Sequence, residues 1–292
     1  MENRINYLQI ENFKSIKDMH LDCNRVNIFI GEPNVGKSNI LEAISLLGAD
    51  YERNSKKFLS SFMRYEKFSN LFYDNDFKKS IFVHGNSGGV VIKSFLGDGS
   101  FYNMLLSSNI ELLKNAREAE EQEEFRKLIN NEPKRAYPNN TKEIKTWLTD
   151  IDKSGSSNNL VSSTFNAVKK FTFQSFEEYK NQFSYFLLPP HGDNLFAILF
   201  DREDIYDEFV PMFEKHGQNL VLDTGQTALE VQKNIKGRIY SYPYSSVADT
   251  LQRIIFYLSA IESNKYSVLI FEEPEAHAFP PYTKMLAQRI AN

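Results

Sequence analysis

This 292-residue sequence has a single cysteine, no long apolar run and no excess of basic over acidic residues. Cys23 is the only cysteine, so no internal disulfide can form, and this suits a reducing cytoplasm. No apolar run is long enough to span a membrane, and the first residues contain no signal-peptide core. The net charge of −4 predicts no whole-surface attraction to nucleic acid, although a local basic patch is compatible with it. We therefore expect a cytoplasmic protein without a membrane segment.

Several chemical motifs are absent as well. The sequence has no cysteine–histidine cluster with metal-binding spacing and no G-x-S-x-G element, which argues against a zinc site and a hydrolase nucleophile elbow. It has no internal repeat and no long heptad pattern, which argues against a long coiled-coil arm. The composition, 41% apolar and 25% charged, is that of a globular chain with one large domain or a domain with a large insertion.

Glycine, lysine and serine gather in one short stretch, residues 31–38, which reads GEPNVGKS. The preceding run RVNIFI, residues 25–30, is β-branched and aromatic and predicts a buried strand. Apolar residues recur at helical spacing from residue 40 onward and predict a helix. The stretch matches the P-loop pattern G-x-x-x-x-G-K-[ST] in the required context of strand, loop and helix. The competing interpretation is a glycine-rich turn that only links a strand to a helix.

The chemistry of phosphate binding explains these residue types. Glycines let successive backbone N–H groups converge on a phosphate, and the N-terminus of the next helix favours an anion. Lys37 is predicted to reach the β- and γ-phosphates of ATP, with a catalytic role, and Ser38 to offer its hydroxyl to Mg²⁺. The predicted nucleotide-binding set in this stretch is Gly31, Asn34, Val35, Gly36, Lys37, Ser38 and Asn39.

A second stretch, KYSVLIFEEPEAHAFPP at residues 265–281, narrows the choice among P-loop proteins. Its apolar run, residues 268–271, predicts a short strand that ends in two acids. In P-loop proteins the first acid at such a strand end holds Mg²⁺, and a neighbouring acid can polarise the attacking water. Glu272 is the candidate for the metal and Glu273 for catalysis, while Pro274 ends the strand. The competing interpretation is an acidic strand end followed by a turn.

Together these stretches resemble a known group of ATPases. LQIENFKSIKDMHLD, NIFIGEPNVGKSNILEAI and LIFEEPEAH are similar to the ABC-type ATPases of the SMC, RecF and OLD (overcoming lysogenization defect) group. The similarity is strongest to the AAA-domain ATPases of bacterial defence and DNA repair. LLPPHGDNL, residues 187–195, resembles a segment of RecF-like proteins. The strong matches cover about residues 1–50 and 240–290.

The resemblance implies further site residues. In this group a segment like NFKSI brings backbone and a basic side chain near the nucleotide, so Asn12 and Lys14 are candidates. The segment YSSVADTLQRIIFYLSAI, residues 244–261, stands where the group has its signature serine, which caps the γ-phosphate bound by the other subunit. Ser246 is the candidate, although the glycine of the usual Ser-x-Gly pattern is missing. His277 is either an ordinary loop histidine or a residue at the dimer interface.

The resemblance also implies an architecture. We expect an α/β fold: a P-loop NTPase with an ABC-type mixed sheet core, formed by residues 1–50 and 240–292, and a central α+β insertion at 51–239. Within the insertion we predict short strands around glycine turns and one helix over 108–130, which Ser108 opens as a capping box with Glu111. The chain stops inside a predicted helix, before the strand that carries the group's switch histidine. We therefore expect the natural polypeptide to continue past Asn292, or a partner to cover the sheet edge.

Two classes of function fit the sequence. The first is an ATPase that binds ATP and Mg²⁺, forms an ATP-sandwich homodimer and resets a partner by hydrolysis. That partner is an effector protein, such as a nuclease or toxin in anti-phage defence, or DNA in RecF-like repair. The second is a nucleotide-gated assembly module with little turnover. A GTPase is a distant third, because no Asn-Lys-x-Asp segment is present.

Overall fold

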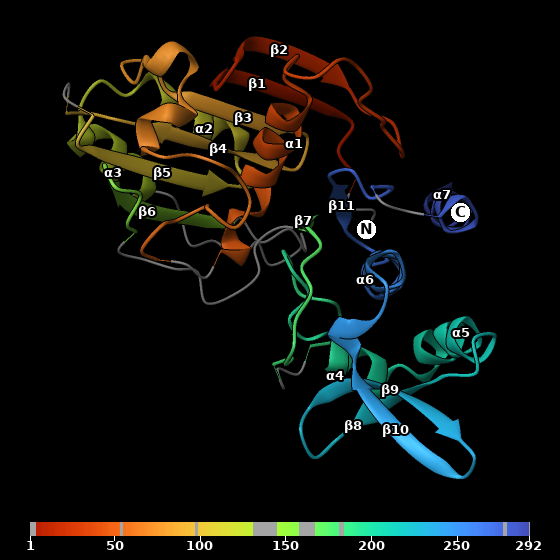
Figure 1. The fold of residues 1–292 in the computed structure, drawn as a ribbon. Coiled ribbons are helices and arrows are strands. Elements are labelled where there is room, and N and C mark those ends of the chain that lie inside the picture. Colours follow the sequence, from red (N-terminus) through yellow and green to blue (C-terminus); the bar gives the residue numbers. More distant parts are fainter. Residues whose placement is uncertain are drawn as a thin grey trace, which may run out of the picture. The chain divides into compact units, whose positions relative to one another are not determined.

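A computed structural model describes residues 4–52, 55–96, 99–130, 145–157, 167–180, 184–276 and 279–291. The chain divides into two compact units, Met1–Lys169 and Lys170–Asn292 (Figure 1). No helix in the described part is long and apolar enough to cross a bilayer. Helices and strands occur together in both units, so the chain is an α/β protein as expected.

Unit 1 contains a six-stranded sheet that is antiparallel throughout, in the order β2-β1-β3-β4-β5-β6. In β1 the side chains of Leu8 and Ile10 are fully buried and Gln9 between them is less buried, which is the alternation of a half-buried strand. The strands are β1 (Tyr7–Phe13), β2 (Ile16–Asp22), β3 (Ile81–Gly85), β4 (Gly88–Lys93), β5 (Phe101–Ser107) and β6 (Thr146–Asp152). In this sheet β1 and β2 precede residue 50 of the chain, and β3 to β6 follow it. The division into an ATPase core and an insertion at 51–239 stays a prediction.

Helices α1 (Lys37–Ser45), α2 (Ile110–Glu118) and α3 (Gln122–Asn130) belong to the same unit. Helix α1 and the 3₁₀ helix Leu46–Tyr51 that follows it pack against β1, β3 and β4. The apolar faces of α2 and α3 pack against the sheet in a cluster that includes Phe82, Val91 and Leu105. Two further 3₁₀ helices are Phe68–Leu71 and Tyr73–Asn75.

The single helix expected over 108–130 is wrong, because the chain forms two helices there. The predicted cap is also displaced by one residue: Asn109, not Ser108, accepts a hydrogen bond from the backbone N–H of Leu112 (3.2 Å). Ser108 instead donates its backbone N–H to the carbonyl of Lys145 (3.0 Å). The ammonium of Lys93 donates to the last carbonyl groups of the α2 segment, including that of Arg117 (2.8 Å), and this contact stabilises the end of α2.

The buried strand expected at residues 25–30 is also wrong. These residues form no strand, and Ile28 and Ile30 are 77% and 89% exposed. A β-branched run becomes a strand only where a neighbouring strand pairs with it. In unit 1 both edges of β1 are already taken, by β2 and β3, and no described strand pairs with residues 25–30. The mixed ABC-type sheet that would contain this strand therefore stays a prediction.

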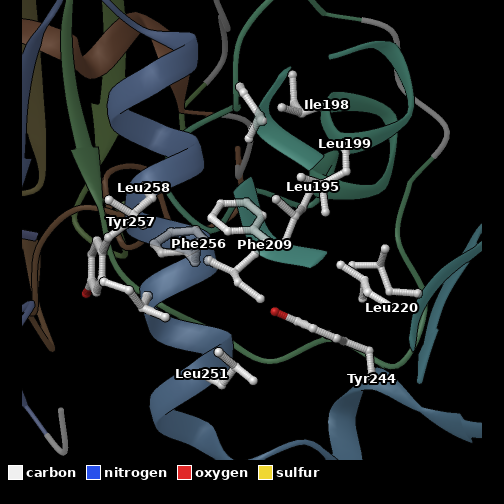
Figure 2. Packing of buried hydrophobic residues seen from close by; sticks show 14 of the residues in the cluster. Leu195, Ile198, Leu199, Phe209, Leu220, Tyr244, Leu251, Phe256, Tyr257 and Leu258 are labelled. Atoms are coloured by element: carbon white, nitrogen blue, oxygen red, sulfur yellow. The ribbon is translucent and has the colours of Figure 1, made fainter. Parts of the chain in front are cut away.

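Unit 2 is built around helix α6 (Asp249–Ser263), whose apolar residues pack against α4 (Leu195–Asp201) and α5 (Glu203–Glu214). Figure 2 shows Phe256 of α6 among Leu195 and Leu199 of α4 and Phe209 of α5. The strand predicted at residues 268–271 is confirmed as β11 (Val268–Phe271). Unit 2 also contains the three-stranded sheet of β8 (Asn219–Asp223), β9 (Ala228–Ile235) and β10 (Arg238–Pro243). A short strand, β7 (Val168–Phe171), pairs with β11, and α7 (Pro280–Ala291) packs on α6.

Tyr244 fixes the start of the α6 segment in this core. It belongs to a 3₁₀ turn, Tyr244–Ser246, that links β10 to α6. The residue is 3% exposed, and its hydroxyl has no hydrogen-bond partner within the described residues. Figure 2 shows its side chain in the hydrophobic cluster. Burial raises the pKa of Tyr244 well above its ordinary value, so the side chain stays neutral and anchors the turn.

Candidate nucleotide-binding site

The glycine stretch folds as a loop that leads directly into α1. Gly36 is the N-cap of the helix, with a left-handed φ of 93°, and Asn34 also has a positive φ of 63°. A Cβ atom added at Gly36 would lie 2.9 Å from the Oγ of Ser15, closer than side chains approach one another. The loop therefore needs glycine at this position for both its conformation and its packing.

The N-terminus of α1 has the features of an anion-binding site. No side chain caps it, so its N-terminal N–H groups have the unpaired donors and the dipole that favour a phosphate. The ammonium of Lys37 bends back over the loop and donates to the carbonyls of Gly31 (2.8 Å) and Glu32 (2.6 Å). Loop residues 31–35 are exposed. This arrangement of backbone donors and one lysine fits the phosphates of a nucleotide, with Ser38 in the same turn.

The turn between β1 and β2 is packed on this loop. Ser15 accepts a hydrogen bond from the amide of Asn39 (2.7 Å), and Lys14 pairs with the carboxylate of Glu42 in α1. The ammonium of Lys14 also donates to the carbonyl of Arg64 (2.6 Å). Sequence reasoning missed Ser15, although it follows directly after the predicted Asn12 and Lys14. The structure thus brings the NFKSI segment and the start of α1 together.

The side chain of Asn12 forms hydrogen bonds to backbone carbonyls of unit 1. Its side-chain amide donates to the carbonyls of Asp76 (3.1 Å) and Lys79 (2.8 Å), and the residue is 7% exposed. These bonds hold a surface segment against β1. The assignment of Asn12 and Lys14 to the nucleotide stays a prediction.

The two candidate acids lie in unit 2, in the turn that follows β11. The Oε2 atom of Glu272 lies 3.4 Å from the Nζ of Lys170, a lysine of β7 whose side chain is 4% exposed. Glu273 is exposed and adopts a positive φ of 46°, and its carbonyl accepts from the N–H of Ala276 (3.0 Å). Within the described ranges no three acidic, histidine or cysteine side chains form a metal site. The metal and catalytic roles of these acids therefore stay predictions.

The candidate signature serine also belongs to unit 2. The hydroxyl of Ser246 donates to the carbonyl of Pro243 (2.7 Å), and the residue is exposed. Gln252 of α6 donates to the carbonyls of Ser245 (3.3 Å) and Val247 (2.6 Å), so the helix holds the segment in place. His277 lies outside the described residues.

Four predicted site residues have a left-handed backbone conformation. Nine described non-glycine residues have a positive φ, and four of them, Asn12, Lys14, Asn34 and Glu273, are predicted site residues. A left-handed conformation costs roughly 1–3 kcal/mol at a non-glycine residue, and such strain clusters at binding and catalytic sites. The other five, Leu59, Asp74, Asn75, Thr227 and Lys236, are not predicted site residues, so the site assignment stays a prediction.

Comparison with known proteins agrees with the N-terminal motif. Residues 4–85 match the sequence model of the AAA ATPase domain family, which covers less than half of the chain. No curated protein matches the chain. Among solved structures, an Smc head domain with an extended coiled coil, bound to the C-terminal domain of ScpA and derived from Pyrococcus furiosus, is 13% identical. The alignment covers 98% of this chain and 86% of that one with a TM-score of 0.43, which is too low to establish a common fold. The family match supports an ATP-binding ATPase domain at the N-terminus.

Proposed function

We propose that the chain is a Mg²⁺-dependent ATPase of the ABC type that dimerises on ATP and controls a partner. The observation that carries this proposal is the loop at residues 31–38, which ends at an uncapped helix N-terminus and is covered by the ammonium of Lys37. The match to the AAA ATPase domain family supports the same interpretation.

The proposed roles follow from the chemistry of each side chain. Lys37 and Ser38 serve the phosphates and Mg²⁺, and Glu272 adds a carboxylate ligand to the metal. Glu273 polarises the attacking water as a general base. Ser246 caps the γ-phosphate held by a second subunit. The partner is an effector protein, such as a nuclease or toxin in bacterial anti-phage defence, in an OLD-like arrangement.

Two alternatives remain distinct from this proposal. One is a RecF-like ATPase that acts on DNA in repair. The other is an assembly module that binds ATP with little turnover. Multiple-turnover phosphate release from the purified chain separates an ATPase from an assembly module.

Nucleotide binding is tested by Lys37→Ala. Loss of a charge-assisted contact of this kind costs about 1.5–3 kcal/mol, so the affinity for ATP is expected to fall at least about tenfold. Calorimetric titration with ATP and Mg²⁺ measures this change. Lys78→Ala, an exposed lysine of the same unit, is the matched control and should bind ATP as the unsubstituted chain does. Equal affinity in the Lys37 variant contradicts the P-loop assignment.

Catalysis and dimerisation are tested by Glu273→Gln. This change keeps the shape of the side chain but removes the base, so hydrolysis should slow by roughly 10²–10⁴-fold while ATP binding persists. Because ATP would bind both subunits of the sandwich, it must stabilise the dimer, and the variant should accumulate as an ATP-bound dimer. Light scattering with and without ATP and Mg²⁺ measures the mass.

Further variants separate the roles in that assay. Glu272→Gln should weaken Mg²⁺ binding as well as hydrolysis, and Ser246→Arg should prevent the gain of mass by adding bulk at the proposed interface. Hydrolysis by Glu273→Gln at the unsubstituted rate removes the catalytic assignment. Tight ATP binding without any gain of mass removes the sandwich dimer.

A further inference from the structure

The hairpin of β9 and β10 carries a surface that the ATPase function does not use. All six residues of β10 are exposed, whereas Leu229 and Val231 at the base of β9 are buried in the core of unit 2. In the sheet order β10-β9-β8, strand β10 forms one edge. Figure 1 shows the free end of the hairpin pointing away from α6. The hairpin is thus anchored at its base and open along one side.

The turn of the hairpin fixes the register of this edge. Lys236 and Gly237 form a two-residue loop with positive φ values of 51° and 79°, and the side chain of Asn234 accepts from the N–H of Gly237 (3.0 Å). Ile235 and Arg238 face each other across the loop. By the alternation of an antiparallel ladder, Ile239 and Ser241 then direct their N–H and C=O groups to the open edge. These groups are available to an additional strand.

Both faces of β10 expose apolar side chains. Tyr240 and Tyr242 point to the face of the sheet that contains buried Val231, and they are 41% and 43% exposed. Ile239 points to the opposite face and is 67% exposed. A ligand that covers both faces and the edge at once must be an extended chain whose side chains alternate as those of a strand do.

Positive charge surrounds the end of this edge. Lys233, Lys236 and Arg238 lie within six residues, all are exposed, and none makes an ion pair with another described residue. The chain as a whole carries a net charge of −4, so the hairpin is a local basic surface on an acidic protein. Cations on an edge strand discourage pairing with a second copy of the same hairpin, and they favour a partner with acidic residues.

We propose that the open edge of β10 binds an extended protein segment in which acidic residues alternate with apolar ones, as a fourth strand of the β8–β9–β10 sheet. The acidic side chains lie on the face of Lys233 and Arg238, and the apolar ones lie beside Ile239. Tyr240 and Tyr242 pack against the stems of the acidic residues. The interaction needs neither nucleotide nor metal, so it stands apart from the proposed ATPase function.

Nucleic acid is the competing ligand for a basic and aromatic surface. Bases would stack on Tyr240 and Tyr242, and phosphates would contact the cations, but all these contacts lie on one face or at the loop. The exposed Ile239 on the other face and the open backbone edge would gain nothing from such a ligand. The exposure on both faces therefore favours a strand-forming peptide.

Fluorescence anisotropy with the full chain tests the proposal. The probe is a labelled peptide, Glu-Val-Glu-Val-Glu-Val-Glu, and the matched probes are its lysine counterpart and a version with a central proline. We expect binding of the acidic peptide alone. Ser241→Pro removes an edge N–H without changing charge, and it should weaken binding at least about tenfold. Arg238→Glu should weaken it similarly, and Lys284→Glu, the same charge change on α7, should leave it unchanged.

The remaining outcomes overturn the proposal. No binding of the acidic peptide overturns it, as does equal binding of the lysine peptide. The surface is assigned to nucleic acid if the chain binds oligothymidylate and not the peptide, and if Arg238→Glu abolishes that binding while Ser241→Pro preserves it. A dimer by light scattering that Ser241→Pro converts to monomer assigns it to a second copy. If the melting temperature shows that Ser241→Pro unfolds the hairpin, Ile239→Lys replaces it, and undiminished peptide binding by that variant overturns the proposal.

Discussion

Each predicted half of the site contains a lysine–glutamate pair, and the two pairs differ in which member is buried. In unit 1 the side chains of Lys14 and Glu42 are 13% and 2% exposed, so the carboxylate is the more deeply buried member. In unit 2 the side chains of Lys170 and Glu272 are 4% and 24% exposed, so the lysine is buried and the carboxylate reaches solvent. Lys14 directly follows β1, and Glu272 directly follows β11.

The difference indicates a difference in role. A buried carboxylate depends on its protein partner because water cannot replace that partner, so Glu42 acts as a structural anchor for α1 and the β1–β2 turn. A carboxylate that reaches solvent can exchange its partner for water or a cation. Glu272 can therefore be held by Lys170 and still be offered to Mg²⁺, whereas Glu42 cannot. Two substitutions sharpen or break this comparison, and a third tests the strained backbone beside Glu272.

The largest effect is expected for Lys14→Met. The change leaves the charge of Glu42 buried. Among the described residues, its carboxylate then keeps only the backbone N–H of Arg64 (3.3 Å) and the exposed guanidinium of the same residue (3.7 Å) as polar partners. We expect a loss of about 3 kcal/mol in the free energy of unfolding, measured by chemical denaturation without nucleotide. The double variant Lys14→Met/Glu42→Leu should recover most of the loss, because an apolar pair needs no charge compensation. A single variant as stable as the unsubstituted chain would show that Glu42 is not an anchor.

An intermediate effect, of opposite sign, is expected for Glu273→Asn. Asparagine tolerates the left-handed backbone that Glu273 adopts, so the free energy of unfolding should rise by up to about 1 kcal/mol. ATP hydrolysis should be lost in the same variant, because the amide cannot act as the base. Glu275→Asn is the control, since Glu275 is exposed and has no positive φ. If Glu273→Asn is more stable and still hydrolyses ATP at the full rate, the positive φ of Glu273 has no connection with catalysis.

The smallest effect is expected for Lys170→Met. Here the carboxylate left behind reaches water, and a buried ammonium is removed with it, so the change in unfolding free energy should stay within about 1 kcal/mol. Differential scanning calorimetry measures it alongside Lys14→Met. A loss as large as that of Lys14→Met would mean that Glu272 is as dependent on its lysine as Glu42, and the comparison would fail.

Local sequence patterns predicted the elements that local interactions form. Apolar and polar residues alternate at 7–13, where β1 forms, and the helix predicted from residue 40 onward and the strand predicted at 268–271 also appear in the structure. In the strands the alternation matches the period of 2, and in the helix the apolar spacing matches the period of 3.6. The P-loop motif likewise fixes its own geometry, because Gly36 adopts a conformation that other residues disfavour.

Other expectations failed or were incomplete because distant residues decide them. Residues 25–30 have strand-forming side chains but no pairing strand within unit 1, and the helix at 110 begins at Asn109 because its side chain bonds the Leu112 N–H. Ser15 contacts Asn39 and approaches Gly36 only after the β1–β2 turn folds onto the loop. Nothing in the local sequence of residue 15 distinguishes it from any other turn serine.

The sequence by itself predicted the chemistry: a loop with the P-loop pattern and a pair of acids after a strand. Only the tertiary structure decided which charges are fixed and which are available, because burial depends on atoms contributed by the whole unit. Glu42 and Glu272 are the same residue type beside the same kind of cation, and packing alone makes one an anchor and the other a candidate ligand. Packing also decides the surface of β10, whose apolar side chains are exposed and whose outer edge pairs with no described strand.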